Sequence, residues 1–167
     1  MKILVTGAGT LVGNTISIKI PKKHKVFSSY NKTLPKNLKK FKNITTCKID
    51  LTKEIKFNKN FDILVHCASL VPAKTSSKKL FYNVNILGFK KLLELSKKNN
   101  CKKIILLSTM SVYGEIKSNT ITEKTKFNNP DSYGMSKIKM EKSLEEFSKK
   151  NNMSGFVLRL PGILGNK

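Results

Sequence analysis

The first thirteen residues constrain the fold of this chain more than any other segment. They read MKILVTGAGTLVG: an apolar run over 2–6, a glycine-rich turn, and the start of a short apolar helix. Glycines let the backbone turn tightly and approach a pyrophosphate, which is then held by the free N–H groups where the helix begins. The segment therefore predicts a strand–turn–helix unit that binds a dinucleotide. A glycine turn without a ligand is the alternative.

The rest of the chain alternates between short apolar runs and longer helical patterns. This alternation predicts a parallel sheet covered on both faces, which is a three-layer, doubly wound α/β fold. A length of 167 residues suits one domain spanning 1–167. The expected strands are 2–6, 25–30, 44–49, 62–66, 103–108 and 155–160, and the expected helices are 12–19, 79–98 and 133–150. We expect loops at 114–131 and at the lysine-rich stretch 31–43, which could also form a poor helix.

Tyr133 and Lys137 lie four residues apart on the last of these helices, a spacing that suits an acid–base pair. Positions i and i+4 of a helix lie one above the other, so the ammonium of Lys137 can lie beside the phenol of Tyr133. A neighbouring cation lowers the phenol pKa from about 10 and so favours acid–base work. The pair continues into an apolar stripe of Met140, Leu144 and Phe147, which indicates that both polar heads point inward. A surface tyrosine with an unrelated lysine is the alternative.

These motifs together resemble the extended short-chain dehydrogenase/reductase family, also called the NAD-dependent epimerase/dehydratase family. The family pattern Thr-Gly-x-x-Gly-x-x-Gly, laid on Thr6 and Gly7, matches its last glycine at Gly13 but meets Thr10 at the middle position, with Gly9 one place early. Further matches are Asp50-Leu51, His66-Cys67-Ala68-Ser69, Asn85-Ile86-Leu87-Gly88 and Arg159-Leu160-Pro161-Gly162, and a hydroxyl residue, Thr109, lies upstream of Tyr133 in Ser108-Thr109-Met110-Ser111.

The resemblance implies a Rossmann fold, NAD or NADP as cofactor, and a nucleotide-linked sugar as substrate. Tyr133 would exchange a proton with the sugar, Thr109 would orient the reacting oxygen, and Lys137 would bind the ribose and tune Tyr133, as in an epimerase or keto-sugar reductase. Dehydration is disfavoured, because Met110 and Ser111 replace the Asp-Glu pair of the dehydratases. The implied cofactor-binding residues are Gly7, Gly9, Thr10, Leu11, Val12, Gly13, Asn31, Lys32, Asp50, Leu51, Cys67, Ala68, Ser69, Asn85, Tyr133, Lys137 and Pro161.

Family members are longer than this chain, which lacks their C-terminal substrate-binding region. A dinucleotide-binding module without independent catalysis is therefore the alternative function. The choice of cofactor depends on the end of the second strand, where an acidic residue would hold the ribose of NAD. The segment 28–32 has no carboxylate, and Lys32 could meet a 2′-phosphate, which tilts the expectation toward NADP.

Several residues also have simpler interpretations. Asp50 could cap the following turn together with Thr52. His66 at a strand end is more often a hydrogen-bonded structural residue than a catalyst, and Arg159 is expected to anchor the last strand.

The formal charge of +23 raises the possibility of nucleic-acid binding. Arg159 is the only arginine, however, and the lysines are spread over the whole chain, so we disfavour a role in nucleic-acid binding.

Three cysteines without a Cys-x-x-Cys pair indicate neither a disulfide framework nor a metal site and fit the cytoplasm. No apolar run reaches the ~18 residues of a membrane span.

The helix expected over 79–98 is apolar on two arcs, one with Val84, Leu87 and Leu95 and one with Ile86, Phe89 and Leu93. A helix packed only against a sheet needs one stripe. We therefore expect a homodimer through helices 79–98 and 133–150, with deeper burial inside one chain as the alternative.

Overall fold

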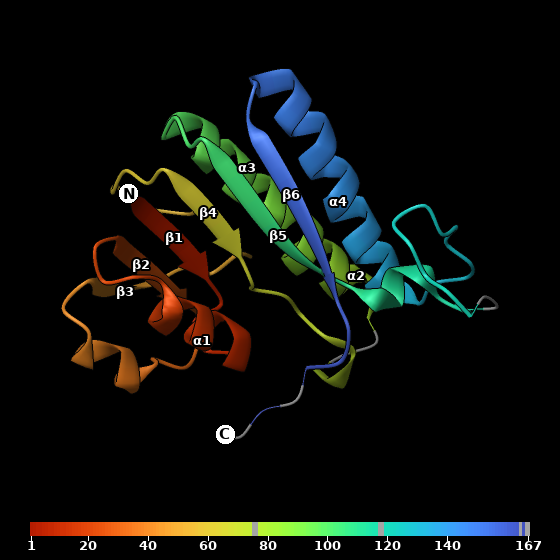
Figure 1. Cartoon of the computed structure of the whole chain (residues 1–167), viewed down its shortest axis with the longest axis horizontal. Helices are drawn as coiled ribbons and strands as arrows, with labels where there is room; N and C mark the ends of the chain where they lie inside the picture. The colour runs from red at the N-terminus through yellow and green to blue at the C-terminus, as the bar shows by residue number, and fades with distance from the viewer. Residues whose placement is uncertain (75–76, 117–118, 164, 166–167) are drawn as a thin grey trace.

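A computed structural model of the chain describes residues 1–74, 77–116, 119–163 and 165. Its six described strands form one parallel sheet in the order β3-β2-β1-β4-β5-β6 (Figure 1). The chain winds outward from β1 to β3, crosses back to place β4 beside β1, and winds outward again. The predicted doubly wound fold is confirmed. The strands are β1 (Lys2–Thr6), β2 (Lys25–Tyr30), β3 (Ile44–Lys48), β4 (Ile63–His66), β5 (Lys103–Thr109) and β6 (Ser154–Leu160).

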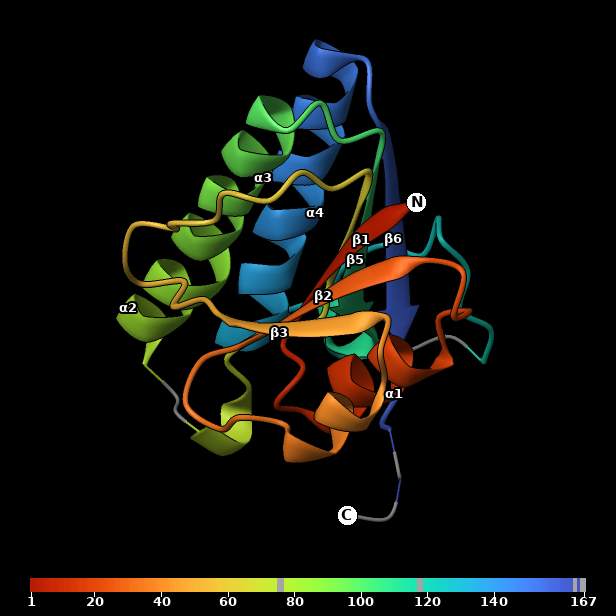
Figure 2. The ribbon, with the colours of Figure 1, turned by 90° about the vertical axis from the view of Figure 1, so that its left-hand side faces the viewer.

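Helical segments lie on both faces of the sheet (Figure 2). One face carries α1 (Leu11–Lys19) and the short 3₁₀ helix η1 (Lys36–Lys40), which falls in the stretch expected to be a loop or poor helix. The other carries α4 (Ser132–Asn151) and the predicted helix 79–98. That helix is three consecutive segments: α2 (Lys78–Phe81), the π-helical η3 (Tyr82–Leu87) and α3 (Gly88–Lys98). The 3₁₀ turns η2 (Pro72–Lys74) and η4 (Met110–Tyr113) follow β4 and β5.

Each face of the sheet has its own hydrophobic core. On one side, residues of α3 and α4 such as Leu92 and Leu144 pack against Leu64 of β4. On the other side, Val12 of α1 packs in a second cluster with Val5. Because the central strands are buried on both faces, they read as unbroken apolar runs, and this made them recognisable in the sequence.

Burial within one chain explains the arc of Ile86, Phe89 and Leu93 in the helix predicted at 79–98, whereas in the other arc Leu95 is buried and Val84 and Leu87 are half-buried. Phe89 is fully buried and stacks on the His66 ring with centroids 4.9 Å apart, and Ile86 and Leu93 are also buried. Phe89 therefore has no surface to offer a second chain. Exposed apolar side chains nearby are Leu80, Tyr82 and Met135.

The strand β6 differs from the expectation of a strand buried on both faces. Phe156, Val157 and Leu158 are 38–48% exposed, because β6 is the last strand of the described sheet. Among the described residues, no helix is both long and apolar enough to cross a membrane.

Candidate functional site

The predicted site residues gather where the strands end. Parallel strands present their carboxyl ends at one edge of the sheet, and a doubly wound sheet binds ligands where the strand order reverses. Here the reversal lies between β1 and β4. The loops after these two strands and after β5, together with the start of α4, form the candidate site.

The glycine turn after β1 is packed too closely for side chains at two positions. Gly7 has a φ of 77°, and a Cβ there would lie 2.7 Å from the amide nitrogen of Ala68. A Cβ at Gly13 would lie 2.3 Å from the carbonyl oxygen of Gly7. The bare backbone thus brings the start of α1 against the turn, where N–H groups of the helix start other than that of Gly13, which bonds to Thr10, can face an anion. This cradle fits the pyrophosphate of a dinucleotide.

Thr10 has a structural role at the position where the family pattern has glycine. Its hydroxyl accepts a hydrogen bond from the Gly13 amide (3.3 Å) and donates to the Gly7 carbonyl oxygen (2.8 Å), so Thr10 is the N-cap of α1. Gly9 lies close to the loop after β2, since a Cβ there would be 3.0 Å from the Thr33 carbonyl oxygen. The neighbouring Asn31 and Lys32 are exposed beside this turn.

The loop after β4, which carries Cys67, Ala68 and Ser69, is held by Asn85 of η3. The fully buried Asn85 side chain accepts from the Leu70 amide (2.8 Å), donates to the Leu70 carbonyl oxygen (3.1 Å) and donates to Ser136 Oγ of α4 (3.0 Å). Asn85 was expected to bind cofactor. In the structure its side-chain amide instead connects this loop to α4. The π-helical turn around it is a feature often found at functional sites.

Tyr133, Lys137 and Thr109 come from the first turns of α4 and the end of β5. Asp131 caps α4, its Oδ1 accepting from the Gly134 amide at 2.6 Å. Lys137 is almost completely buried, as the predicted inward stripe requires, and its Nζ donates to the Leu107 carbonyl oxygen at 2.6 Å. The Thr109 hydroxyl accepts from the amide of Ser111 at 3.2 Å.

The charge state of this site differs from the expectation. Burial raises the pKa of Tyr133, an effect that a hydrogen bond with Ser69 partly offsets. Burial also lowers the pKa of Lys137 to about 8, against the opposing charge of Glu141. The expected lowering of the Tyr133 pKa by Lys137 is therefore not present in this arrangement, in which the ammonium is directed to the Leu107 carbonyl.

Other predicted residues are placed around this centre. Asp50 accepts from both the amide (2.9 Å) and the hydroxyl (2.7 Å) of Thr52, the capping arrangement left open by the sequence, and these bonds lower its pKa. The Leu51 side chain is buried in the core, and Pro161 is exposed after β6. The described residues contain no cluster of three or more metal-ligating side chains.

His66 has the structural role that the sequence favoured. Its Nδ1 lies 2.7 Å from Thr6 Oγ1, which also accepts from the Ala68 amide at 3.3 Å. Thr6 thus joins the end of β4 to the loop that follows it, and the other ring nitrogen of His66, Nε2, is buried without a hydrogen-bond partner among the described residues. Complete burial lowers the pKa of His66 from 6.5 to about 3, with the charge of Lys137 contributing.

We expect His66 to make the fold sensitive to acid. Between pH 6.5 and about 3 the unfolded state holds a proton on this ring that the folded state excludes, so stability falls as the pH falls. The slope should be about 1.4 kcal/mol per pH unit. Urea unfolding of wild type and His66→Gln from pH 7 to 4 measures it. Equal slopes in the two proteins would contradict this role.

Sequence reasoning missed three residues that hold the site together: Thr6, Ser136 and Glu141. Each is a polar residue at a position that packs inside the protein. For Glu141, a signal was available, because it lies four residues after Lys137 and hence one helical turn away.

Comparison with known proteins agrees with this geometry. The family model described as the NAD dependent epimerase/dehydratase family matches residues 3–167. The chain belongs to this family. Among its relatives, an uncharacterized UDP-glucose epimerase of Bacillus subtilis is 29% identical over 99% of the chain and 57% of its own length. D-erythronate dehydrogenase of Haemophilus influenzae is 32% identical over 61% of the chain and 33% of its own length.

A solved family member has the same architecture. The UDP-glucose 4-epimerase of Bifidobacterium longum, in complex with NAD⁺ and UDP, superimposes with a TM-score of 0.82 at 26% identity, over 95% of this chain and 52% of that one. The present chain thus spans about half the length of this family member and of the Bacillus subtilis relative.

Proposed function

We propose that this chain is the cofactor-binding half of an NAD(P)-dependent epimerase or keto-sugar reductase that acts on a nucleotide-linked sugar. The supporting observation is that the side-chain-free cradle of Gly7 and Gly13 lies at the same edge of the sheet as Thr109, Tyr133 and Lys137. The relatives named as UDP-glucose epimerases agree with this substrate class.

In the proposed reaction, bound NAD(P) supplies the hydride acceptor and donor. Tyr133 Oη takes a proton from a sugar hydroxyl or returns it, and Thr109 Oγ1 holds that oxygen by a hydrogen bond. To contact the ribose and lower the Tyr133 pKa, the Lys137 ammonium must either break its hydrogen bond with the Leu107 carbonyl oxygen or use another of its N–H groups for the ribose. Its three donors allow such sharing.

A dinucleotide-binding module without catalysis of its own is the second candidate. It is favoured by the coverage of the relatives, of which this chain spans about half. The raised pKa of Tyr133 also agrees with it, since this phenol is not yet set for proton transfer.

Calorimetric titration of the 167-residue chain with NAD and with NADP tests the proposal. Either function predicts binding of one of these cofactors, and a chain that binds neither would contradict both functions.

We propose a preference for NADP because of Lys32, although the Bifidobacterium longum relative was crystallised with NAD⁺. Lys32→Ala should then weaken the binding of NADP and leave the binding of NAD unchanged. An equal effect on both affinities would contradict a role for Lys32 in the choice between the two cofactors. UDP-glucose turnover by the chain alone would exclude the module.

A homodimer through α2, α3 and α4 stays a prediction. With Phe89 buried, its contact surface would have to use exposed side chains such as Leu80, Tyr82 and Met135. Light scattering at high protein concentration tests it, and a monomeric mass would contradict it.

A further inference from the structure

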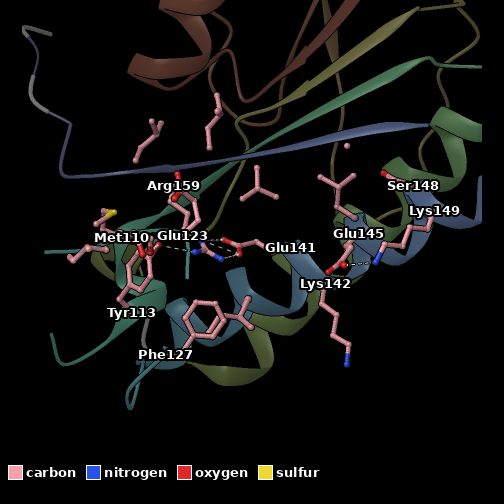
Figure 3. Close-up of a pocket in the computed structure, with 18 of the residues that line it drawn as sticks. Met110, Tyr113, Glu123, Phe127, Glu141, Lys142, Glu145, Ser148, Lys149 and Arg159 are labelled. Carbon is pink, nitrogen blue, oxygen red and sulfur yellow. Dashed lines mark hydrogen bonds and ion pairs between the residues drawn. The ribbon is translucent and has the colours of Figure 1, made fainter. Parts of the chain in front are cut away.

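Arg159 makes contacts that a lysine could not reproduce. It is the one arginine among the 33 cationic Lys and Arg residues of the chain. It lies on β6, beside a groove of about 1320 Å³ between β6 and α4 (Figure 3). Its Nε donates to both carboxylate oxygens of Glu141 at 3.2 Å, and its Nη2 donates to Oε2 at 2.7 Å. Such a fork requires a planar guanidinium.

The other side of the guanidinium contacts η4 and Phe127, which precedes α4. Nη1 of Arg159 donates to Tyr113 Oη at 2.8 Å, and this phenol donates to the Thr122 carbonyl oxygen at 2.9 Å. The guanidinium carbon lies 5.1 Å from the ring centroids of both Tyr113 and Phe127. Arg159 thus contacts two points of the segment that connects Thr109 to Tyr133.

Glu141 connects Arg159 to the candidate site by hydrogen bonds. Its carboxylate accepts from the hydroxyl of Ser108, the residue before Thr109. One turn earlier on α4, Lys137 donates to the carbonyl oxygen of Leu107. Two successive turns of α4 are therefore bonded to consecutive residues of β5.

We propose that Arg159 and Glu141 form a positioning pair that fixes Thr109, Tyr133 and Lys137 relative to one another. The inference rests on the proposed function of these three residues. The hydrogen bonds of Arg159 and Glu141 are with other residues of the chain, so we assign the pair a positioning role rather than a catalytic one. The pair acts by tying β5, α4, β6, η4 and the described residues around Thr122 and Phe127 into one unit.

Hydrogen exchange without cofactor tests the structural part of the proposal. Arg159→Lys keeps the charge and loses the fork, so amide exchange in residues 119–128 should rise about tenfold or more, the ratio that corresponds to about 1.4 kcal/mol. Tyr113→Phe, which keeps the ring and removes the hydrogen bonds of the phenol with Arg159 and Thr122, should raise exchange in the same segment. Glu145→Gln is the matched control, because it breaks an exposed ion pair with Lys149 on the same helix and should change nothing there.

The pH dependence of NAD affinity provides a readout that a purely structural role would not move. The titratable groups that act on Lys137 are Glu141 on its own helix, His66 at the end of β4 and Cys67 in the loop after it, and burial keeps the latter two uncharged. Glu141 is thus the charge that favours the ammonium. NAD affinity should fall at high pH, when Lys137 loses the proton of its ammonium group. Glu141→Gln removes the charge that favours this ammonium, so the fall in NAD affinity should move to lower pH by about one unit.

The two experiments separate this proposal from the proposed function. An unchanged pH profile in Glu141→Gln, with exchange in 119–128 unchanged in Arg159→Lys, would overturn the positioning pair even if both variants unfold at lower urea concentration. A wild-type chain that binds no dinucleotide would contradict the proposed function, and the exchange comparison would still decide whether the pair fixes the segment.

Discussion

Replacing Tyr133 by phenylalanine, assayed together with whatever supplies the substrate site, is expected to lower the turnover of a nucleotide-linked sugar by about 100-fold or more, the usual contribution of a positioned acid–base group. The change removes the only proton that the phenol can transfer and keeps the ring. NAD(P) affinity should remain nearly unchanged. Turnover of UDP-glucose under saturating cofactor measures the effect.

A matched control is available within the same chain. Tyr82 is an exposed tyrosine outside the candidate site, so Tyr82→Phe makes the same chemical change and should leave turnover intact. Equal activity of wild type and Tyr133→Phe would rule out the mechanism.

The other two catalytic candidates should differ from Tyr133 in a characteristic way. Thr109→Ala should lower turnover with little effect on cofactor affinity, because it removes a hydrogen bond to the substrate oxygen. Lys137→Ala should lower both, since the ribose contact and the charge beside the phenol are lost together. It also leaves the Leu107 carbonyl oxygen without this donor.

Gly13→Val is expected to weaken NAD(P) binding by about 100-fold or more, which corresponds to about 3 kcal/mol. A Cβ at this position would lie 2.3 Å from the Gly7 carbonyl oxygen, so the start of α1 must move away from the turn. Displacement separates the N–H groups from the pyrophosphate that they would hold. Calorimetric titration with NAD measures the loss.

The Gly13 variant should also be less stable, so stability needs its own control. Gly155→Ala places a Cβ 2.4 Å from Ser148 Oγ at the amino end of β6, the opposite edge of the sheet. It should lower the unfolding midpoint and keep cofactor affinity. Should Gly13→Val fail to fold, Gly9→Val crowds the same turn at a more exposed position. Unchanged affinity in a folded Gly9→Val would contradict the assignment of the turn.

Much of the fold could be read from the sequence because its determinants are local. The unbroken apolar run of β5 reflects burial on both faces, and the glycine turn requires residues whose φ and close contacts exclude a side chain, as at Gly7. The inward stripe of α4 follows from helical periodicity alone, and Met140 and Leu144 are indeed buried.

Contacts between distant segments had to come from the tertiary structure. Periodicity shows that residues of the 79–98 helix avoid water but not which surface covers them, and Phe89 is covered by His66 of its own chain. The spacing of Tyr133 and Lys137 places them one turn apart, yet the pKa of each depends on burial and on groups from other segments, such as Ser69 for Tyr133 and Cys67 for Lys137. The network of Arg159 likewise joins β5, η4, α4 and β6. Sequence alone thus determined the elements, their order and the candidate residues, whereas only packing in three dimensions decided their partners and charge states.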